Sequence, residues 1–326
     1  MPRLNRRALL YLALLLMALA VPLYGNVYYT RFATQIAIYG MAALSVDLLL
    51  GYVGLITFGQ AAFVGVGAYV TGMLTVAGID DALIVWPAAM LVAVAFALVI
   101  GALSLRTEGF QFIMVTLAFA QMVYYIAQSL RSYGGDNGFT LGGRDALAGM
   151  SLANHTVFYY VVLALLVAVM AIAFRVVGSE FGMVIRGRRD NERRLAAIGF
   201  PPFAYKYAAF LIAAAIAGLS GALMANHSSF VSPAILSWQV SGQLLAMVIL
   251  GSPGTLIGPV FGAAIYLVFQ QVLSDYTDHW MIFFGPLLVA RVLFIKEGVW
   301  GLLLRACGAH EVPAPGAVAP DRGAAE

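Results

Sequence analysis

The chain has 326 residues, of which 62% are hydrophobic and 10% are charged, and its net charge is +3. A soluble domain averages about 45–50% apolar and about 25% charged residues, so this composition excludes soluble enzymes and nucleic-acid-binding proteins. A membrane-spanning helix needs roughly 20 apolar residues, and the apolar content allows on the order of ten such helices. The sequence therefore predicts an all-α, polytopic integral membrane protein with about 8–10 transmembrane helices.

The first apolar run, 8–21, follows three arginines among the first seven residues. A basic start before a short apolar run is also the pattern of a signal peptide, and Ala-Leu-Ala at 18–20 offers a cleavage site. The next apolar run begins shortly afterwards, at Phe32, and an even number of spans fits better if the first is kept. We therefore expect 8–21 to be the first span, with cleavage as the alternative.

Nine further apolar runs are candidate spans. They are 32–50, 55–76, 83–105, 110–130, 156–177, 205–225, 238–250, 257–273 and 280–295. The runs 238–250 and 257–273 are short for a crossing, and Gly-Ser-Pro-Gly at 251–254 separates them, so we expect tilted, broken or re-entrant helices there. Residues 1–305 are then one transmembrane domain, and 306–326, rich in Pro, Ala and Gly, form a disordered tail.

Basic residues are distributed unevenly between the two sides that alternating spans define. With a cytoplasmic N-terminus, the inner segments carry fourteen of the 18 Lys and Arg residues, whereas the outer segments carry only Arg31, Arg131 and Arg144. Positive charge collects on the cytoplasmic side of membrane proteins. We therefore expect both termini in the cytoplasm, a large polar segment outside at 131–155 and another inside at 178–204.

The inner segment 178–204 has mixed charge and regularly placed apolar residues, which predicts a short amphipathic helix. Its apolar contacts are expected from Phe181, Val184, Ile185, Leu195 and Ile198. Such a helix can lie in a groove of a cytoplasmic motor subunit and transmit its movement. The alternative is a solvated loop whose arginines only set the topology.

Ionisable residues within the predicted spans are scarce. The candidates for an ion-binding role are Asp47 and Arg291, and both are compatible with purely structural roles. Carriers driven by an ion gradient usually need ionisable groups near the midplane, so this scarcity disfavours such a mechanism. No Gly-Lys pair occurs, so the chain lacks the loop that binds nucleotide triphosphates and does not hydrolyse ATP itself. The single cysteine, Cys307, excludes an internal disulfide and a cysteine metal site.

Glycine is concentrated around the predicted third span, at Gly51, Gly54, Gly59, Gly65 and further positions up to residue 72. Small residues let helices approach closely in lipid, and a broken helix can also expose backbone groups to a substrate path. Uncharged polar residues in the same spans either line such a path or bond between helices. The candidate path residues are Thr57, Phe58, Gly59, Gln60, Thr116 and Gln121.

Several stretches resemble the permeases of branched-chain amino acid ABC importers. They read GYVGLITFGQAAFVGVGAY at 51–69, LRTEG at 105–109 with MVTLAFAQ at 114–121, and GGDNG at 134–138. The block at 105–121 resembles the LivM-type subunit rather than its LivH-type partner, and the whole resemblance covers about residues 30–304. The chain departs from the family at Gln60, where His or a similar residue is usual, and at 186–189, where an Ala-Ile-Arg run is usual.

The resemblance implies a fold close to the type II importers and a bacterial inner-membrane location. It implies a LivH-type permease partner, two cytoplasmic ABC ATPase subunits, and a periplasmic binding protein that delivers Leu, Ile or Val; it implies no cofactor, metal or nucleic acid. The alternatives are a permease for urea or another small polar solute, and an ion-coupled secondary transporter. The residues expected to couple the chain to the ATPase are Glu180, Phe181, Gly182, Arg186, Arg189, Glu192, Ala197 and Gly199.

Overall fold

The computed structural model describes residues 14, 16–147, 150–277, 279–294 and 301. The predicted tail, 306–326, lies outside these residues, as does most of the predicted first span, 8–21. Within that span, residues 16–20 are helical.

The described chain is almost entirely helical. Its α-helices are α2 (Val27–Asp47), α3 (Gln60–Val76), α4 (Ala82–Ser104), α5 (Gly109–Ser129), α6 (His155–Gly178), α7 (Glu180–Asp190), α8 (Glu192–Ala197), α9 (Pro202–Ser228), α10 (Trp238–Gly251), α11 (Gly258–Ser274) and α12 (Met281–Phe294). Short 3-10 helices are η1 (Val21–Tyr24), η3 (Arg131–Tyr133), η4 (Gly135–Asn137) and η5 (Pro233–Leu236), and η2 (Leu48–Val53) is a π-helix. Two antiparallel strand pairs join β1 (Phe139–Thr140) to β4 (Phe230–Val231) and β2 (Ala146–Leu147) to β3 (Met150–Ser151).

Five helical segments of the described chain are long and apolar enough to cross a membrane: α2 with η2, α4, α5, α6 and α9. The shorter apolar helices α3, α10, α11 and α12 accompany them. These segments correspond to the runs predicted after the first and confirm an all-α polytopic membrane protein. The 14 residues of α10 rise about 21 Å at about 1.5 Å per residue, less than the roughly 30 Å hydrocarbon core.

The predicted boundary between the second and third spans was wrong. Helix α2 continues through η2 to Val53, and α3 begins only at Gln60, so residues 54–59 interrupt the helix. The single amphipathic helix expected at 178–204 is instead two helices, α7 and α8, with Asn191 capping the second through a bond to the Arg194 N–H group.

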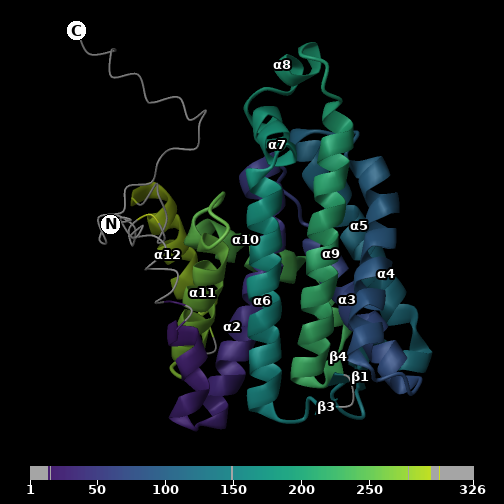
Figure 1. The fold of residues 1–326 in the computed structure, drawn as a ribbon, viewed down its shortest axis with the longest axis vertical. Coiled ribbons are helices and arrows are strands. Elements are labelled where there is room, and N and C mark those ends of the chain that lie inside the picture. The colour runs from purple at the N-terminus through teal and green to yellow at the C-terminus, as the bar shows by residue number, and fades with distance from the viewer. Residues whose placement is uncertain (1–13, 15, 148–149, 278, 295–300, 302–326) are drawn as a thin grey trace, which may run out of the picture.

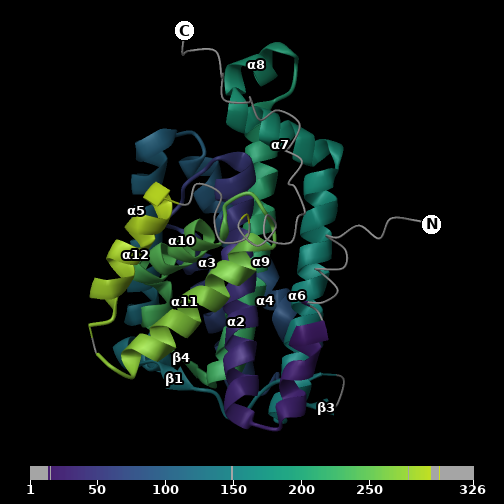
Figure 2. The same ribbon diagram turned by 90° about the vertical axis from the view of Figure 1, so that its left-hand side faces the viewer.

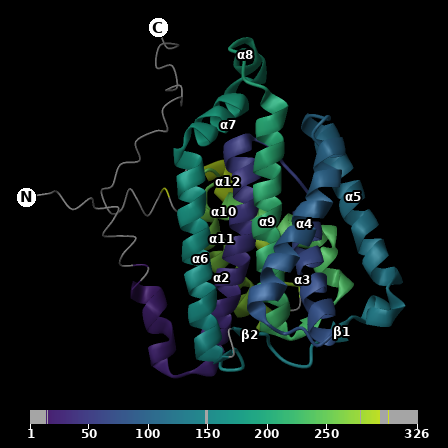
Figure 3. The same cartoon turned by 45° about the vertical axis from the view of Figure 1, so that its right-hand side comes forward.

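The two ends of the molecule differ in character (Figure 1). Helices α7 and α8 project at one end, here called the tip, and the strand pairs lie at the opposite end, here called the strand end. Figure 2 shows α11 crossing in front of α2, while Figure 3 shows α5 at the edge of the bundle. Only 28% of the apolar stretch of α5 is buried, which leaves a face of this helix for lipid or another subunit.

Helix α9 lies at the centre of the bundle, against α2, α3 and α4. It approaches α3 closely because glycines on each helix lie against the backbone of the other. A Cβ on Gly221 of α9 would lie 1.8 Å from the Val64 carbonyl oxygen, and one on Gly67 of α3 would lie 2.1 Å from the Gly218 carbonyl oxygen. Without a hydrophobic driving force between helices in lipid, such close packing is a main source of association.

The α3–α9 contact predicts that Gly221→Ala destabilises the protein. The added methyl group meets backbone that cannot move aside cheaply, and overpacking of this kind costs about 1–3 kcal/mol. Gly285→Ala in α12 is the matched control, because nothing lies within 4 Å of that position. Thermal unfolding in detergent should show a lower midpoint for Gly221→Ala than for Gly285→Ala, and equal midpoints would contradict the packing described.

Candidate functional site

The break between η2 and α3 is held by three hydroxyl groups, one within the break and two from other helices. Thr57 is buried and its Oγ1 accepts the N–H of Gly59 at 3.0 Å. Thr116 of α5 accepts the N–H of Phe58 at 3.4 Å, and Ser241 of α10 accepts that of Ala61 at 3.0 Å. Non-helical backbone at membrane depth is tolerated only where the protein satisfies its polar groups, and these side chains do so.

Gln60 faces the bundle interior. It is fully buried, and its Nε2 donates to Ser45 Oγ at 3.0 Å and to the Ala213 carbonyl oxygen at 3.2 Å. Its side chain therefore bonds between α2 and α9. Of the two roles that the sequence left open for Gln60, the geometry favours interhelical bonding.

Gln121 lies apart from the break, more than one helical turn beyond Thr116 along α5. It belongs to a cavity of about 370 Å³ between α5 and the start of α10. The described residues that line this cavity are Gln121, Tyr124, Ala234, Ser237, Trp238 and Gln239. The predicted path residues thus divide between the break, the interior and this cavity.

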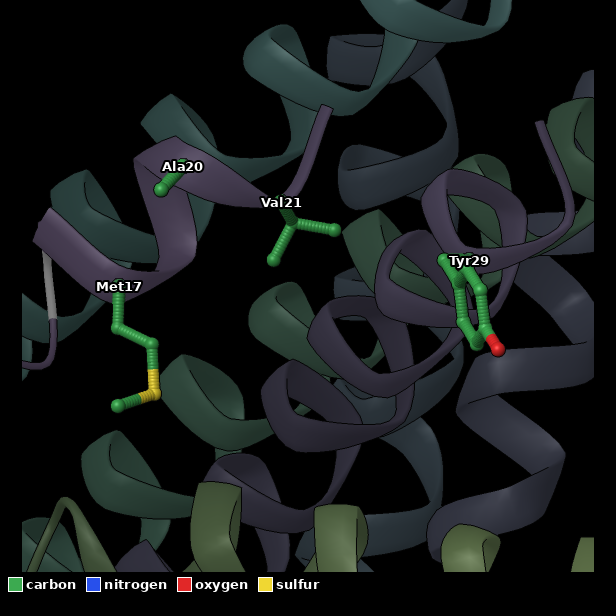
Figure 4. Close-up of a pocket in the computed structure, with 4 residues that line it drawn as sticks. All are labelled: Met17, Ala20, Val21 and Tyr29. Carbon is green, nitrogen blue, oxygen red and sulfur yellow. The ribbon is translucent and has the colours of Figure 1, made fainter. Parts of the chain in front are cut away.

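A larger hollow of about 550 Å³ is lined, among the described residues, by Met17, Ala20, Val21 and Tyr29. Figure 4 shows the first three on the N-terminal segment and Tyr29 across from them on α2. Because its lining is apolar apart from one hydroxyl group, it suits lipid acyl chains rather than a polar solute.

At the tip, two arginines of α7 bind the backbone of η2. Arg188 donates from Nη1 to the Val53 carbonyl oxygen at 2.8 Å, and Arg189 donates from Nη1 to that of Gly51. Hydrogen bonds from a charged donor are stronger than neutral ones. Helix α7 is therefore attached to the π-helix that directly precedes the break.

Glu192, the first residue of α8, links α7 to α9 through two ion pairs. Its carboxylate binds Arg188 at 2.8 Å and Lys206 of α9 at 2.7 Å. Partial burial raises the pKa of Glu192. The hydrogen bond from Lys206 and the charge of Arg188 lower it by more, so the pKa lies below its usual range. The network joins the tip to α9 through ionised groups.

The same π-helix also contacts the connection between α10 and α11. Asp47 Oδ1 accepts the Gly254 N–H at 2.7 Å, and a Cβ on Gly51 would lie 2.3 Å from the Gly254 nitrogen. This hydrogen bond supports the structural role, one of the two that the sequence left open for Asp47. Among the described residues Asp47 makes no ion pair with Arg291, whose guanidinium is largely buried.

The predicted coupling residues fall into two groups. Phe181, Gly182, Arg186, Arg189 and Glu192 face the chain itself: Arg186 binds the carbonyl oxygens of Gly182 and Val177 at 3.1 Å, and the Phe181 ring lies 5.7 Å from that of Tyr205. Glu180, Ala197 and Gly199 are exposed. Arg186 is therefore held within the tip, whereas Arg189 binds η2 and is also exposed at the surface of the tip.

The apolar residues of the tip also divide in two. Val184, Ile185 and Leu195 are buried, whereas Ile198 is 68% exposed. Met183 is 66% exposed and Phe200 40% exposed, and the sequence analysis did not select either. The helical periodicity of α7 could have identified Met183 as exposed, because it lies on the face of the helix opposite the buried Ile185.

A buried polar cluster that the sequence analysis missed lies at the strand end. The Asp145 carboxylate is fully buried and accepts from Asn226 at 2.7 Å, Thr75 at 3.1 Å and Trp86 at 3.2 Å. Burial raises the pKa of Asp145. The cluster anchors the segment between α5 and α6 to α3, α4 and α9.

These features define a multi-pass membrane protein with a broken helix in its interior and a polar tip attached to that break. Residues 28–292 match the family described as branched-chain amino acid transport system, permease component, and the chain belongs to this family. It is therefore a component of a transport system.

Two curated relatives extend this comparison. The chain is 27% identical over 321 residues to the high-affinity branched-chain amino acid transport system permease protein LivM of Salmonella typhimurium, and 26% identical to that of Escherichia coli. Each match covers 90% of this chain and 75% of the relative. No solved structure matches the chain.

Proposed function

We propose that this chain is one of two permease subunits in an ATP-driven importer of Leu, Ile or Val. A LivH-type subunit, two cytoplasmic ABC ATPase subunits and a periplasmic binding protein complete the transporter. The names of the relatives support the substrate class. The observation that carries the proposal is the attachment of the tip to η2 by Arg188 and Arg189, because it links a protruding surface to the helix break.

The distribution of basic residues supports a cytoplasmic tip. Among the described residues, the tip end carries Arg106, Arg175, Arg186, Arg188, Arg189, Arg193, Arg194 and Lys206, whereas the strand end carries Arg31, Arg131 and Arg144. Positive charge favours the cytoplasmic side. Both termini are then cytoplasmic in the bacterial inner membrane, 1–305 form the permease domain with its coupling segment at 178–204, and 306–326 form the tail.

In this account the ATPase subunits move the tip, and the tip moves the break. A ligand shifts a conformational equilibrium only by its differential affinity for the two states. ATP supplies that difference by binding the closed motor dimer. The movement passes from α7 through η2 to Thr57, Phe58 and Gly59, whose bond to Thr116 holds the closed arrangement.

The proposed function predicts that the complete transporter in vesicles accumulates leucine only with ATP. The energy comes from the ATPase subunits because the chain has no nucleotide loop, and unlabelled isoleucine or valine should compete whereas urea should not. Uptake of radiolabelled leucine measures this. Accumulation by this chain alone under an ion gradient, or transport of urea in preference to leucine, would contradict the proposal.

The exposed apolar surface of the tip supports its role as the docking site of an ATPase subunit. Met183, Ile198 and Phe200 are exposed on this projecting segment, and we expect them to be covered by a protein partner. Glu180, Ala197 and Gly199 are exposed on the same projecting segment.

Ile198→Asp is therefore expected to weaken copurification of the ATPase subunits about tenfold or more, because burying an unpaired carboxylate in an interface costs several kcal/mol. The matched control is Ile79→Asp at the strand end, where Ile79 is 41% exposed. Quantified copurification from membranes checks this. Equal recovery of the ATPase subunits with both variants would show that the tip is not part of the interface.

A further inference from the structure

The cavity between α5 and α10 has features of a solute site. Its volume of about 370 Å³ corresponds to about a dozen waters at roughly 30 Å³ each. It is at the lower end of the roughly 300–1,000 Å³ typical of small-molecule sites. The cavity therefore has room for a small amino acid with a few waters.

Its wall is polar but uncharged. The described residues that line it include amide or hydroxyl groups on Gln121, Tyr124, Ser237 and Gln239, and none of them is Asp, Glu, His, Lys or Arg. The Nε2 of Gln121 is itself buried and has no partner among the described residues. Lipid acyl chains cannot satisfy such groups, so the wall is suited to a polar solute without net charge.

The start of α10 adds hydrogen-bond donors to this wall. Ser237, the N-cap residue, makes no side-chain capping bond, and the N-terminus of α10 lies at the cavity because Ser237, Trp238 and Gln239 line it. The N-terminus of a helix favours a carboxylate. Tyr124 accepts a hydrogen bond from Gln128 at 3.0 Å, which leaves its own proton available to the same carboxylate.

The remaining wall is apolar. Trp238 is 47% exposed and Ala234 lies beside it in the lining. An indole face and a methyl group offer contact to an aliphatic side chain. The wall thus presents separate surfaces to the charged head and the apolar tail of one molecule.

The cavity lies on the strand-end side of the break. Gln121 and Tyr124 follow Thr116 along α5, which runs from the tip end to the strand end, and Ser237 precedes Ser241 on the way to the tip. The bonds from Phe58 to Thr116 and from Ala61 to Ser241 therefore lie between the cavity and the tip. In the proposed orientation, the cavity is on the periplasmic side of the break.

We propose that this cavity is the first solute site of the permease and takes a zwitterionic aliphatic amino acid. The start of α10 and Tyr124 receive the carboxylate, the oxygens of Ser237 and Gln239 receive the ammonium group, and Trp238 contacts the aliphatic side chain. The inference rests on the proposed function, since it names a substrate position in that transport path.

Protection of an introduced cysteine tests the site directly. In a Cys307→Ser background, which removes the single native cysteine, Ser237→Cys is alkylated in the complete transporter by a small impermeant thiol reagent. Leucine at ten times its half-saturating concentration should slow alkylation about tenfold, because the free fraction of a site falls as one over one plus the ratio of ligand to dissociation constant. Lysine, with its net charge, should not protect.

Ile79→Cys, exposed at the same end, is the control and should react equally fast with and without leucine. Unchanged alkylation of Ser237→Cys in leucine would overturn the proposal. So would equal protection by lysine. If the transporter still accumulates leucine with ATP, either result contradicts this solute site alone. If the parent transporter does not accumulate leucine with ATP, the proposed function itself is contradicted.

Uptake by a second pair of variants tests the same site independently. Gln239→Leu should reduce the leucine uptake rate of an equally abundant complex about tenfold, the effect expected of a lost hydrogen bond to a charged group. Gln111→Leu, exposed at the opposite end of α5, should transport at the parent rate. Parent-rate uptake by Gln239→Leu would count against the site.

Discussion

A backbone break inside a membrane must have its N–H and C=O groups satisfied by the protein, because lipid offers none of the partners that water does. The rest of this structure depends on how that requirement is met at residues 54–59. Hydroxyl groups of Thr57, Thr116 and Ser241 satisfy the N–H groups on the α3 side, and α5 and α10 are thereby held against the break. Any movement that opens the break must exchange these bonds.

The carbonyl groups before the break accept hydrogen bonds from charged side chains. Arg188 and Arg189 bind the backbone of η2, while Asp47 joins the same π-helix to the connection after α10. Glu192 fixes Arg188 and the nearly buried Lys206. Because ion pairs of this kind are costly to break singly, α7, η2 and α9 are expected to move together, which is what a coupling element requires.

The sequence predicted the spans after the first because long apolar runs report burial in lipid directly. It misplaced the start of α3, since Leu55 and Ile56 continue the apolar pattern although their backbone is not helical. It grouped Gln60 with the path because composition cannot tell whether a buried amide faces a cavity or another helix. Asp145 and Met183 were missed for the same reason: partners distant in sequence, such as Asn226, and the phase of a short helix decide their surroundings.

The central claim is that motion of the tip reaches the break through two guanidinium groups. The most direct measurement is the number of leucine molecules imported per ATP hydrolysed by the reconstituted transporter carrying Arg188→Ala and Arg189→Ala, compared with Arg193→Ala and Arg194→Ala. We predict that the first pair lowers this ratio about tenfold, a coupling energy of ordinary size, while hydrolysis continues, and that the second pair leaves it unchanged. An unchanged ratio for the first pair would contradict the account.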